Sequence, residues 1–260
     1  TTGIPKSAQM THEALITSSQ NSHIRWKVEN NQKVCHGFPL FHIGGSACMT
    51  LGAASMGAVS LPLYIFKPSV TLDIIENEGC SMFIGAPVHL TAMMQDPSFK
   101  DRDLSALKCL VVGGSNPPVE LIKQFSLEFN ADVINGYGMT ETCGLSCTAL
   151  PTDPPELKAI AGLPLPGVSL RVVDENYELV KHDLPGELLY KGPGLMEGYG
   201  NLPDGSSGIN DDGWFPTGDL ATMNSNGYIN IVGRSKEMII RGGENLYPIE
   251  IENYLIEHPG

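Results

Sequence analysis

The sequence predicts an α/β fold: a parallel sheet with flanking helices, followed by a small antiparallel, barrel-like β subdomain and the start of a truncated C-terminal domain. Two observations predict this order. From about residue 34 to residue 136, short apolar runs alternate with helical patterns, which is typical of a parallel sheet covered by helices. Beyond residue 166, short strands of alternating polarity are separated by Gly, Asn and Asp turns, which is typical of an antiparallel sheet or barrel.

Each element of the first half has its own pattern. Apolar runs of strand length predict buried strands at 59–66, 81–86, 108–113 and 131–135. Helical patterns between them predict helices at 69–78, 87–95 and 118–129. The last of these has prolines at its start and one apolar face, as a helix packed on a sheet requires. That face carries Leu121, Ile122, Phe125 and Phe129.

The segment 43–66 contains no charged residue and is long enough to cross a bilayer, which takes about 20 residues. Its Gly, Ser, Thr and Pro residues dilute the hydrophobicity, however. A close-packed helix followed by a buried strand is therefore predicted, and no transmembrane segment. The first residues also lack the basic region and apolar core of a secretory signal.

The second half begins after a stretch rich in Pro and acidic residues at 151–166, which favours a domain boundary. Strands are predicted at 168–173, 186–191 and 228–232, and a helix from Pro248. The predicted organisation is an α/β subdomain over 1–153, an antiparallel β subdomain over 154–235, and the beginning of a C-terminal domain over 236–260.

The composition excludes some classes of function. The formal net charge is −13, which repels phosphate backbones and argues against a nucleic-acid partner, although a locally positive pocket can still bind ATP. Six cysteines lie mostly in apolar segments without the spacing of a zinc site. Free, buried thiols in a reducing compartment are predicted. The absence of an Asn-x-Ser/Thr sequon also favours an intracellular protein.

The opening loop, residues 1–6, carries hydroxyls and a glycine and ends in Lys6. Its N–H groups, Thr hydroxyls and ammonium group are suited to a polyphosphate. The spacing is not that of a Walker A loop, and no Gly-x-Gly-x-x-Gly follows a strand. A solvated chain end would account for six such residues equally well.

A second motif, Asn135-Gly-Tyr-Gly-Met-Thr-Glu141, directly follows a predicted strand, where ligands of open α/β sheets bind. Tyr137 between two glycines can lay its ring against a purine. Thr140 can donate to a phosphate, and the carboxylate of Glu141 can hold Mg²⁺. A glycine turn with a capping Thr-Glu pair is the alternative.

Two further motifs lie in the second half. In Trp214-Phe-Pro-Thr-Gly-Asp219-Leu, the carboxylate can accept both hydroxyls of a ribose, and a β-turn aspartate is the alternative. The segment 233–245 mixes charge with glycine, which fits a hinge or a salt-bridged turn equally well.

Together the four motifs resemble, in order and separation, the superfamily of adenylate-forming enzymes: acyl-CoA synthetases, peptide-synthetase adenylation domains and beetle luciferases. Three further segments carry the same resemblance, at 39–45, 113–117 and 186–199. The segment Gly-Arg-Ser-Lys-Glu-Met-Ile-Ile-Arg-Gly-Gly-Glu-Asn-Leu-Tyr-Pro, which begins at Gly233, is similar to fatty acyl-CoA synthetases of the medium-chain type.

The resemblance implies a role for each matching residue. The phosphate loop comprises Thr1, Thr2, Gly3 and Lys6. The adenine site comprises Gly113, Gly114, Ser115, Asn135, Gly136, Tyr137 and Gly138, with the tyrosine ring stacked on the base. Asp219 and Arg234 grip the ribose. Lys6, Thr140 and Glu141 act on the phosphates, and Glu141 binds the metal. The acyl pocket comprises His42, Gly44, Met139 and Cys143, and Lys236 is the hinge.

The implied reaction is the ATP-dependent activation of a fatty carboxylate through acyl-AMP to acyl-CoA, with Mg²⁺ and with coenzyme A as co-substrate. Departures from the family pattern include Ser7, where a glycine is usual, and the absence of a C-terminal lysine and of the usual N-terminal third. The isolated chain is therefore expected to be a poor catalyst. A ligase for aryl or amino acids and a non-catalytic nucleotide-binding protein are the alternatives. A mitochondrial or cytoplasmic location is expected, with any targeting region upstream.

Overall fold

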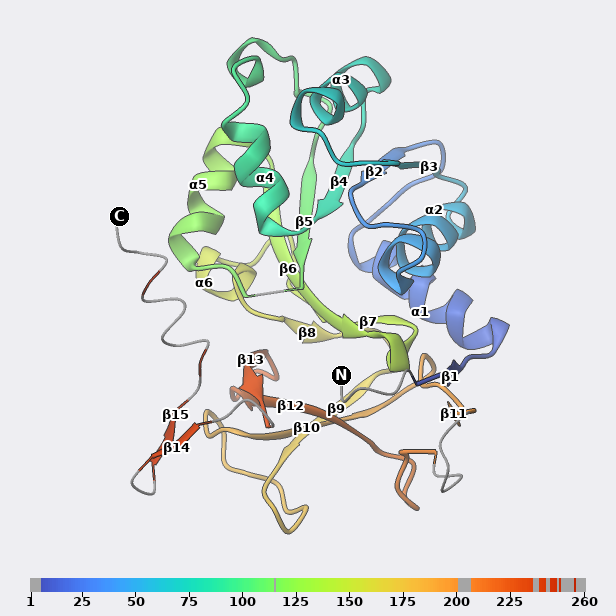
Figure 1. Cartoon of the computed structure of the whole chain (residues 1–260), viewed down its shortest axis with the longest axis vertical. Helices are drawn as coiled ribbons and strands as arrows, with labels where there is room; N and C mark the ends of the chain where they lie inside the picture. The colour runs from blue at the N-terminus through green and yellow to red at the C-terminus, as the bar shows by residue number, and fades with distance from the viewer. Residues whose placement is uncertain are drawn as a thin grey trace.

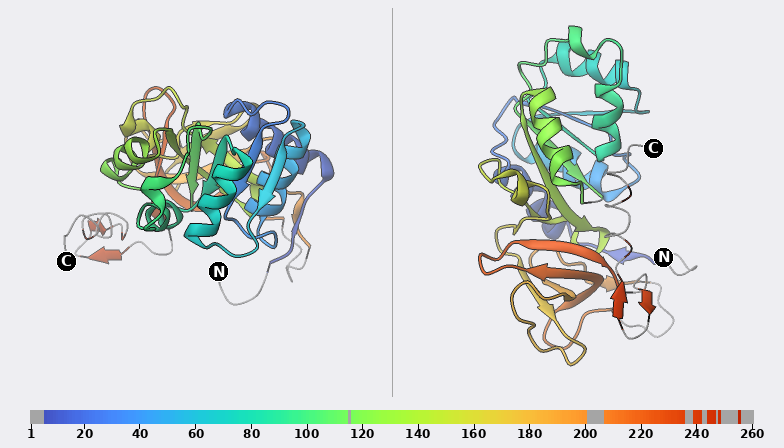
Figure 2. Two further views of the ribbon diagram at one scale, coloured as in Figure 1. Left: turned by 90° about the horizontal axis from the view of Figure 1, so that it is seen from above. Right: turned by 90° about the vertical axis from the view of Figure 1, so that its left-hand side faces the viewer.

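The computed structural model describes residues 6–114, 116–200 and 207–235, and beyond them only 239–241, 244–246, 248 and 255. The chain builds two bodies. Figure 1 shows a sheet flanked by helices in the upper part of the view and an antiparallel sheet below it. A view from the side shows the same two bodies stacked one above the other (Figure 2).

The first body is a sheet of seven strands in the order β3-β2-β4-β5-β6-β7-β8. Its parallel part comprises β2 (Lys33–His36), β3 (Val59–Pro62), β4 (Met82–Gly85), β5 (Cys109–Gly113) and β6 (Asp132–Met139). Two antiparallel strands extend it, β7 (Gly144–Thr148) and β8 (Leu163–Pro164). The sheet is thus mixed, because the chain folds back after the glycine-rich end of β6 instead of crossing over through a helix.

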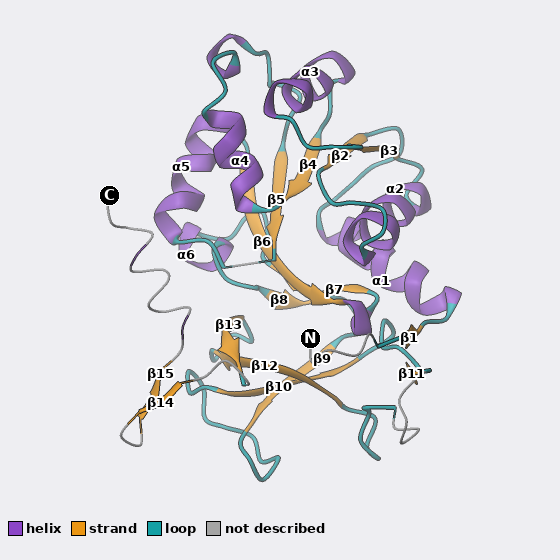
Figure 3. Ribbon diagram, in the orientation of Figure 1, coloured by secondary structure: helices purple, strands orange, loops and turns teal. Residues whose placement is uncertain are grey.

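Helices cover both faces of this sheet (Figure 3). One face packs against α3 (Pro68–Glu78), α4 (Pro87–Met94) and α5 (Val119–Phe129), with the short α6 (Pro155–Lys158) beside α5. The other face packs against α1 (His12–Arg25), a π-helix (Gly44–Leu51) and α2 (Gly52–Ser55). Successive strand residues point to opposite faces, so Leu110 belongs to the first core and Val111 to the second.

The helices predicted at 69–78, 87–95 and 118–129 are confirmed to within a residue or two, and the apolar face of α5 buries Ile122, Phe125 and Phe129. The helix predicted from Pro248 lies largely outside the described residues. The buried strand predicted at 59–66 is wrong in length and burial. Strand β3 ends at Pro62, and Tyr64 beyond it is 98% exposed. The reason is that β3 lies at the edge of the sheet, with β2 as its neighbour. No helix in the described part of the chain is long and apolar enough to cross a membrane.

The second body is an antiparallel sheet of four strands in the order β13-β12-β10-β9. Its strands are β9 (Ser169–Val173), β10 (Gly186–Lys191), β12 (Phe215–Met223) and β13 (Ile229–Arg234). Of the two predicted forms, the sheet rather than the closed barrel describes this order. Its inner face packs on the first body, where Leu188 and Tyr190 share a core with Tyr137 and Cys147.

Two small pairings and two single turns complete the described structure. The pairs are β1 (Ala8–Gln9) with β11 (Gly198–Tyr199) and β14 (Ile239–Arg241) with β15 (Glu244–Leu246). The turns are 3-10 helices at Phe99–Asp101 and Thr140–Thr142. All six cysteines are free and buried, as predicted. The domain boundary at 153/154 stays a prediction; the chain returns to the first sheet as β8 before it enters the second.

Candidate active site

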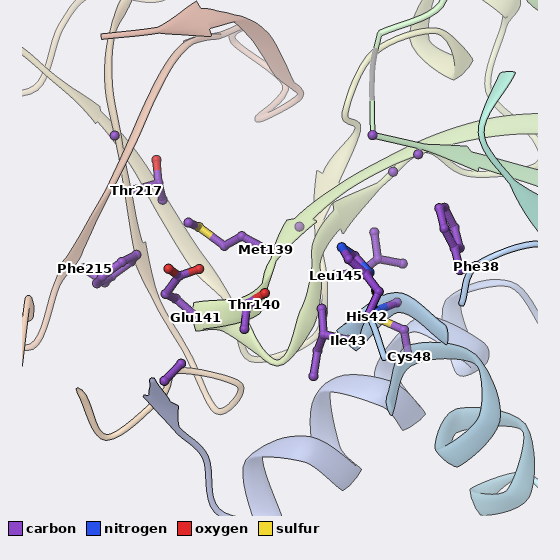
Figure 4. Close-up of a pocket in the computed structure, with 18 of the residues that line it drawn as sticks. Phe38, His42, Ile43, Cys48, Met139, Thr140, Glu141, Leu145, Phe215 and Thr217 are labelled. Carbon is purple, nitrogen blue, oxygen red and sulfur yellow. Dashed lines mark hydrogen bonds between the residues drawn. The ribbon is translucent and has the colours of Figure 1, made fainter. Parts of the chain in front are cut away.

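A pocket of about 1380 Å³ lies between the two bodies (Figure 4). Its walls come from the carboxyl ends of β4, β5 and β6, from the start of the π-helix, and from β12 and β13 of the second sheet. This is the edge of a parallel sheet where α/β proteins bind their ligands. The volume exceeds the several hundred Å³ of an ordinary small-molecule site. The pocket therefore has room for more than one reactant.

Glycine backbone forms the middle of the pocket wall. Gly113 ends β5 and Gly114 follows it, and Gly136 and Gly138 lie in the neighbouring strand β6. A Cβ atom on Gly138 would lie only 2.0 Å from the carbonyl oxygen of Gly144, so the turn between β6 and β7 can close only on a glycine. The four predicted glycines of the adenine site thus come together and expose their main chain to the pocket.

Asn135, another predicted adenine-site residue of this strand, is not brought to the pocket wall. Its side chain is 1% exposed and donates from Nδ2 to Asn116 Oδ1 at 3.0 Å and to the carbonyl of Ala159 at 3.1 Å. Asn116 in turn donates to the carbonyl of Ile231 in β13 at 2.7 Å. These amides hold the two bodies together at the pocket. No role for Asn116 follows from the sequence, although the residue lies in the segment 113–117 that carries the family resemblance.

The predicted ribose residues meet at one carboxylate. Strand register places Asp219 opposite Arg234, and Arg234 Nε lies 3.1 Å from Asp219 Oδ1. The hydroxyl of Tyr137, 82 residues earlier, donates to Asp219 Oδ2 at 2.5 Å. Burial, and then the charge of Asp219, raise the pKa of Tyr137 well above its usual range, so the hydroxyl keeps its proton.

Arg234 lines the pocket together with Thr217 and Gly218, whereas the side chains of Tyr137 and Asp219 lie just behind this wall and face each other. The adenine stacking by Tyr137 and the ribose contact of Asp219 stay predictions. The structure does show that Tyr137 of the first sheet and Arg234 of the second sheet both contact the carboxylate of Asp219.

The residues expected to act on phosphate gather at the outer end of the pocket. Thr140 and Glu141 form the turn after β6, and both line the pocket (Figure 4). Lys6 lines it as well. Glu141 Oε1 accepts a hydrogen bond of 2.6 Å from the hydroxyl of Tyr199, and Lys6 Nζ lies 4.9 Å from the centre of the Tyr199 ring. An ammonium, a hydroxyl and a carboxylate thus face the same space.

The chemistry of this end fits a hard divalent cation. Within the described residues, no group of three or more His, Cys, Asp or Glu side chains could enclose a metal ion. Mg²⁺ commonly takes one or two carboxylates and completes its shell with water and substrate phosphates. Glu141 with the phosphates of a nucleotide would be such a set.

The opposite end of the pocket is apolar. His42 and Gly44 line it, and the backbone N–H of Gly44 donates to His42 Nδ1 at 3.0 Å. The His42 ring lies stacked at 6.2 Å from Phe38. Met139 also lines the pocket, whereas Cys143 is fully buried behind Cys48 and does not. The π-helix that begins at Gly44 belongs to a rare class often found at functional sites.

One charged residue of the pocket was not assigned from the sequence. Glu187 is the second residue of β10 and lines the pocket, and its carboxylate accepts from the backbone N–H of Gly218. Burial raises the pKa of Glu187. Glu187 lies in the segment 186–199, which carries the family resemblance, and this was the one feature of the sequence that could have indicated a role for it. Thr1, Thr2, Gly3, Ser115 and Lys236 lie outside the described residues.

Comparisons with known proteins agree with this geometry. The family model of the AMP-binding enzymes matches residues 1–200. The chain is 36% identical over 259 residues to an indoleacetate–CoA ligase of Aromatoleum aromaticum, covering all of this chain and 51% of that protein. It is 34% identical over 268 residues to the human mitochondrial medium-chain acyl-CoA ligase ACSF2, covering all of this chain and 44% of the relative.

Among solved structures, the chain is similar to the O-succinylbenzoate coenzyme A synthetase of Bacillus subtilis in complex with ATP and magnesium ion. The TM-score is 0.89 at 28% identity, over 99% of this chain and 53% of that one. The chain thus spans about half the length of the curated relatives that it matches.

Proposed function

Because the chain belongs to the AMP-binding enzyme family, we propose that it forms part of an AMP-forming acyl-CoA synthetase that activates an apolar carboxylic acid with ATP. One observation carries the proposal. A single pocket joins an end lined by Lys6, Thr140 and Glu141 to an apolar end beside His42. A triphosphate and a hydrophobic acid can therefore meet within one site.

In the proposed first step, a carboxylate oxygen of the acid attacks the α-phosphorus of ATP, and the bond to pyrophosphate breaks, which leaves acyl-AMP. Little bond chemistry is required of the protein, so positioning and charge stabilisation supply the rate. The ammonium of Lys6 and the hydroxyl of Thr140 would hold phosphate oxygens. Mg²⁺, held by Glu141, would neutralise phosphate charge when bound.

In the second step, the thiol of coenzyme A attacks the acyl carbonyl and AMP leaves. Rotation of the C-terminal domain about the proposed hinge at Lys236 would change the face that this domain presents to the pocket between the two steps. Gly113, Gly114, Gly136 and Gly138 would border the adenine, and Asp219 and Arg234 the ribose. The adenine assignment rests on the fact that all four glycines line the same pocket. The ribose assignment rests on the ion pair between Asp219 and Arg234.

The substrate class follows from the acyl end. The side chains there are Phe38, Ile43, Cys48, Met49, Ile84, Val111 and Leu145, with His42 as the polar exception. Among the described residues that line this end, none carries an acidic group to hold an ammonium or a fixed cation to hold a second carboxylate. A fatty acid is therefore the proposed substrate. An aryl acid is the second candidate, which the indoleacetate–CoA ligase relative favours.

Binding to this chain tests the proposal without requiring turnover. An octanoyl sulfamoyl adenosine, which mimics acyl-AMP but does not react, is titrated by calorimetry beside the phenylacetyl, phenylalanyl and succinyl analogues. We expect the octanoyl compound to bind more tightly than the charged analogues and the guanosine counterpart to bind weakly. Equal binding of all acyl groups would overturn the substrate class, and no binding of any adenosine compound would overturn the function. The isolated chain itself should release pyrophosphate from octanoate and ATP only slowly.

A further inference from the structure

Tyr199 is the one side chain described here that touches both Lys6 and Glu141. Its hydroxyl donates to Glu141 Oε1 at 2.6 Å, and its ring lies 4.9 Å below Lys6 Nζ. The phenol hydroxyl is the donor of this pair, because an ionised carboxylate can only accept a hydrogen bond.

The backbone around Tyr199 fixes this arrangement. Strand β11 pairs with β1, so that Tyr199 lies opposite Ala8, two residues after Lys6. The N–H of Gly200 donates to the carbonyl of Ser7 at 2.8 Å. On its other side, the N–H of Met196 donates to the carbonyl of Glu141 at 2.9 Å. The segment 196–200 is thus bonded to both parts of the phosphate end.

The hydrogen bond from Tyr199 also fixes the orientation of the Glu141 carboxylate. Tyr199 occupies Oε1 of Glu141 and so limits the directions in which the carboxylate can turn. A partner that orients a metal-binding carboxylate in this way typically contributes strongly to metal affinity. The aromatic face, in turn, holds the ammonium of Lys6 near the pocket, which lowers the cost of ordering a long side chain.

We propose that Tyr199 is a positioning residue with two separable parts: its hydroxyl orients Glu141 for the metal ion of a metal–nucleotide complex, and its ring holds Lys6 toward the phosphates. The inference rests on the proposed function, since it assumes a nucleotide with its metal ion in this pocket. On this proposal, β11 connects Lys6 to the turn that follows β6, because Tyr199 contacts both Lys6 and Glu141.

The test separates the two parts by two substitutions. ATP affinity is measured by calorimetry with saturating Mn²⁺ and again in EDTA, and the ratio of the two affinities reports the contribution of the metal ion. Tyr199→Phe keeps the ring, so we expect the ratio to fall about tenfold, with the affinity in EDTA unchanged. Tyr199→Leu also removes the ring, so the affinity in EDTA should fall by a further factor of roughly two to five.

Two controls make the result specific. Tyr64→Phe removes the hydroxyl of a tyrosine that is 98% exposed, and should change neither affinity. In a Glu141→Gln chain, Tyr199→Phe should no longer lower the metal ratio, because the carboxylate on which it acts is absent. Circular dichroism establishes that each variant is folded.

The outcomes are distinct. If the unsubstituted chain binds no ATP, the proposed function fails and the role of Tyr199 with it. If that chain binds ATP with a metal-dependent gain and Tyr199→Phe leaves the gain intact, only the role of Tyr199 is overturned. If Tyr199→Phe lowers both affinities equally, the residue acts through general stability, which likewise overturns the inference.

Discussion

The two bodies that border the pocket contribute to it in different ways. The seven-stranded sheet presents main chain, because the ends of β5 and β6 carry Gly113, Gly114, Gly136 and Gly138. The four-stranded sheet presents charged side chains, namely Glu187 and Arg234, with Asp219 directly behind them. The first body thus determines the shape of the site and supplies Glu141 at the phosphate end, whereas the second body contributes charge through Glu187 and Arg234.

The difference follows from how each sheet is covered. The first has helices on both faces, so its central strands are apolar and only their ends can meet a ligand. The second packs one face on the first body, and its strand ends and edges remain free to carry charge. A ligand bound between them should therefore be sensitive to added volume on one side and to removed charge on the other.

The largest expected effect is that of volume in the first body. Gly138→Ala would place a Cβ atom 2.0 Å from the carbonyl oxygen of Gly144, which is backbone and cannot move aside. We expect the free energy of unfolding to fall by about 3 kcal/mol or more, measured by urea denaturation. Gly113→Ala is the matched control, because its nearest contact would be 3.4 Å. A similar loss in both variants would contradict the claim that close approach decides the effect.

The next effect is that of charge in the second body. Asp219→Ala should weaken ATP binding by roughly 1.5–3 kcal/mol, the range of hydrogen bonds to charged groups. Calorimetry with the folded variant measures the change, and the exposed Asp212→Ala serves as the control. Unchanged affinity in Asp219→Ala would remove this carboxylate from the nucleotide site and leave the second body without its principal predicted contact.

A pH-dependent loss of stability is expected from the first body. His23 in α1 is fully buried, and burial lowers its pKa to about 4, against an unfolded value near 6.5. Between pH 6.5 and pH 4, therefore, the His23 ring is protonated in the unfolded chain and neutral in the folded chain. The stability gained from the neutral ring is present above pH 6.5 and falls as the pH drops toward 4, by about 2 kcal/mol between pH 7 and pH 5.

Unfolding free energies at the two pH values measure this slope. His23→Gln should flatten it, whatever the stability of the variant at pH 7. Burial also lowers the pKa of His36, so this residue contributes to the slope as well and should still contribute in His23→Gln. His12→Gln, at the exposed start of the same helix, should leave the slope unchanged. An unaltered slope in His23→Gln would show that the acid sensitivity lies elsewhere.

Much of the fold could be predicted because local pattern and burial agree. The helices over 69–78, 87–95 and 118–129 carry periodic apolar faces, and the strands over 81–86 and 108–113 are buried on both sides, as continuous apolar runs indicate. The prediction of a buried strand at 59–66 failed because burial depends on a neighbour on each side in the sheet, which apolar composition does not reveal. Strand β12 was missed because Gly218 and Pro216 in it indicate a turn.

The candidate site divides in the same way. The order of the glycine, threonine and carboxylate motifs indicated a nucleotide pocket, and the structure gathers Lys6, Thr140 and Glu141 there. No local pattern indicates that Asn135 turns away from the pocket to bind Asn116 or that Tyr199 meets Glu141. Strand periodicity says that neighbouring side chains alternate, but the partner on each face is chosen by the packing of distant segments.

The sequence by itself determined which chemistry is available, because residue types and their spacing are local properties that survive in any fold. Only the tertiary structure decided which groups meet: Tyr137 with Asp219 across the two sheets, and Tyr199 between Lys6 and Glu141. The physical reason is that a hydrogen bond extends only about 3 Å, whereas Tyr137 and Asp219 stand 82 positions apart in the chain. Such pairs form only where the sheets bring their strand ends together.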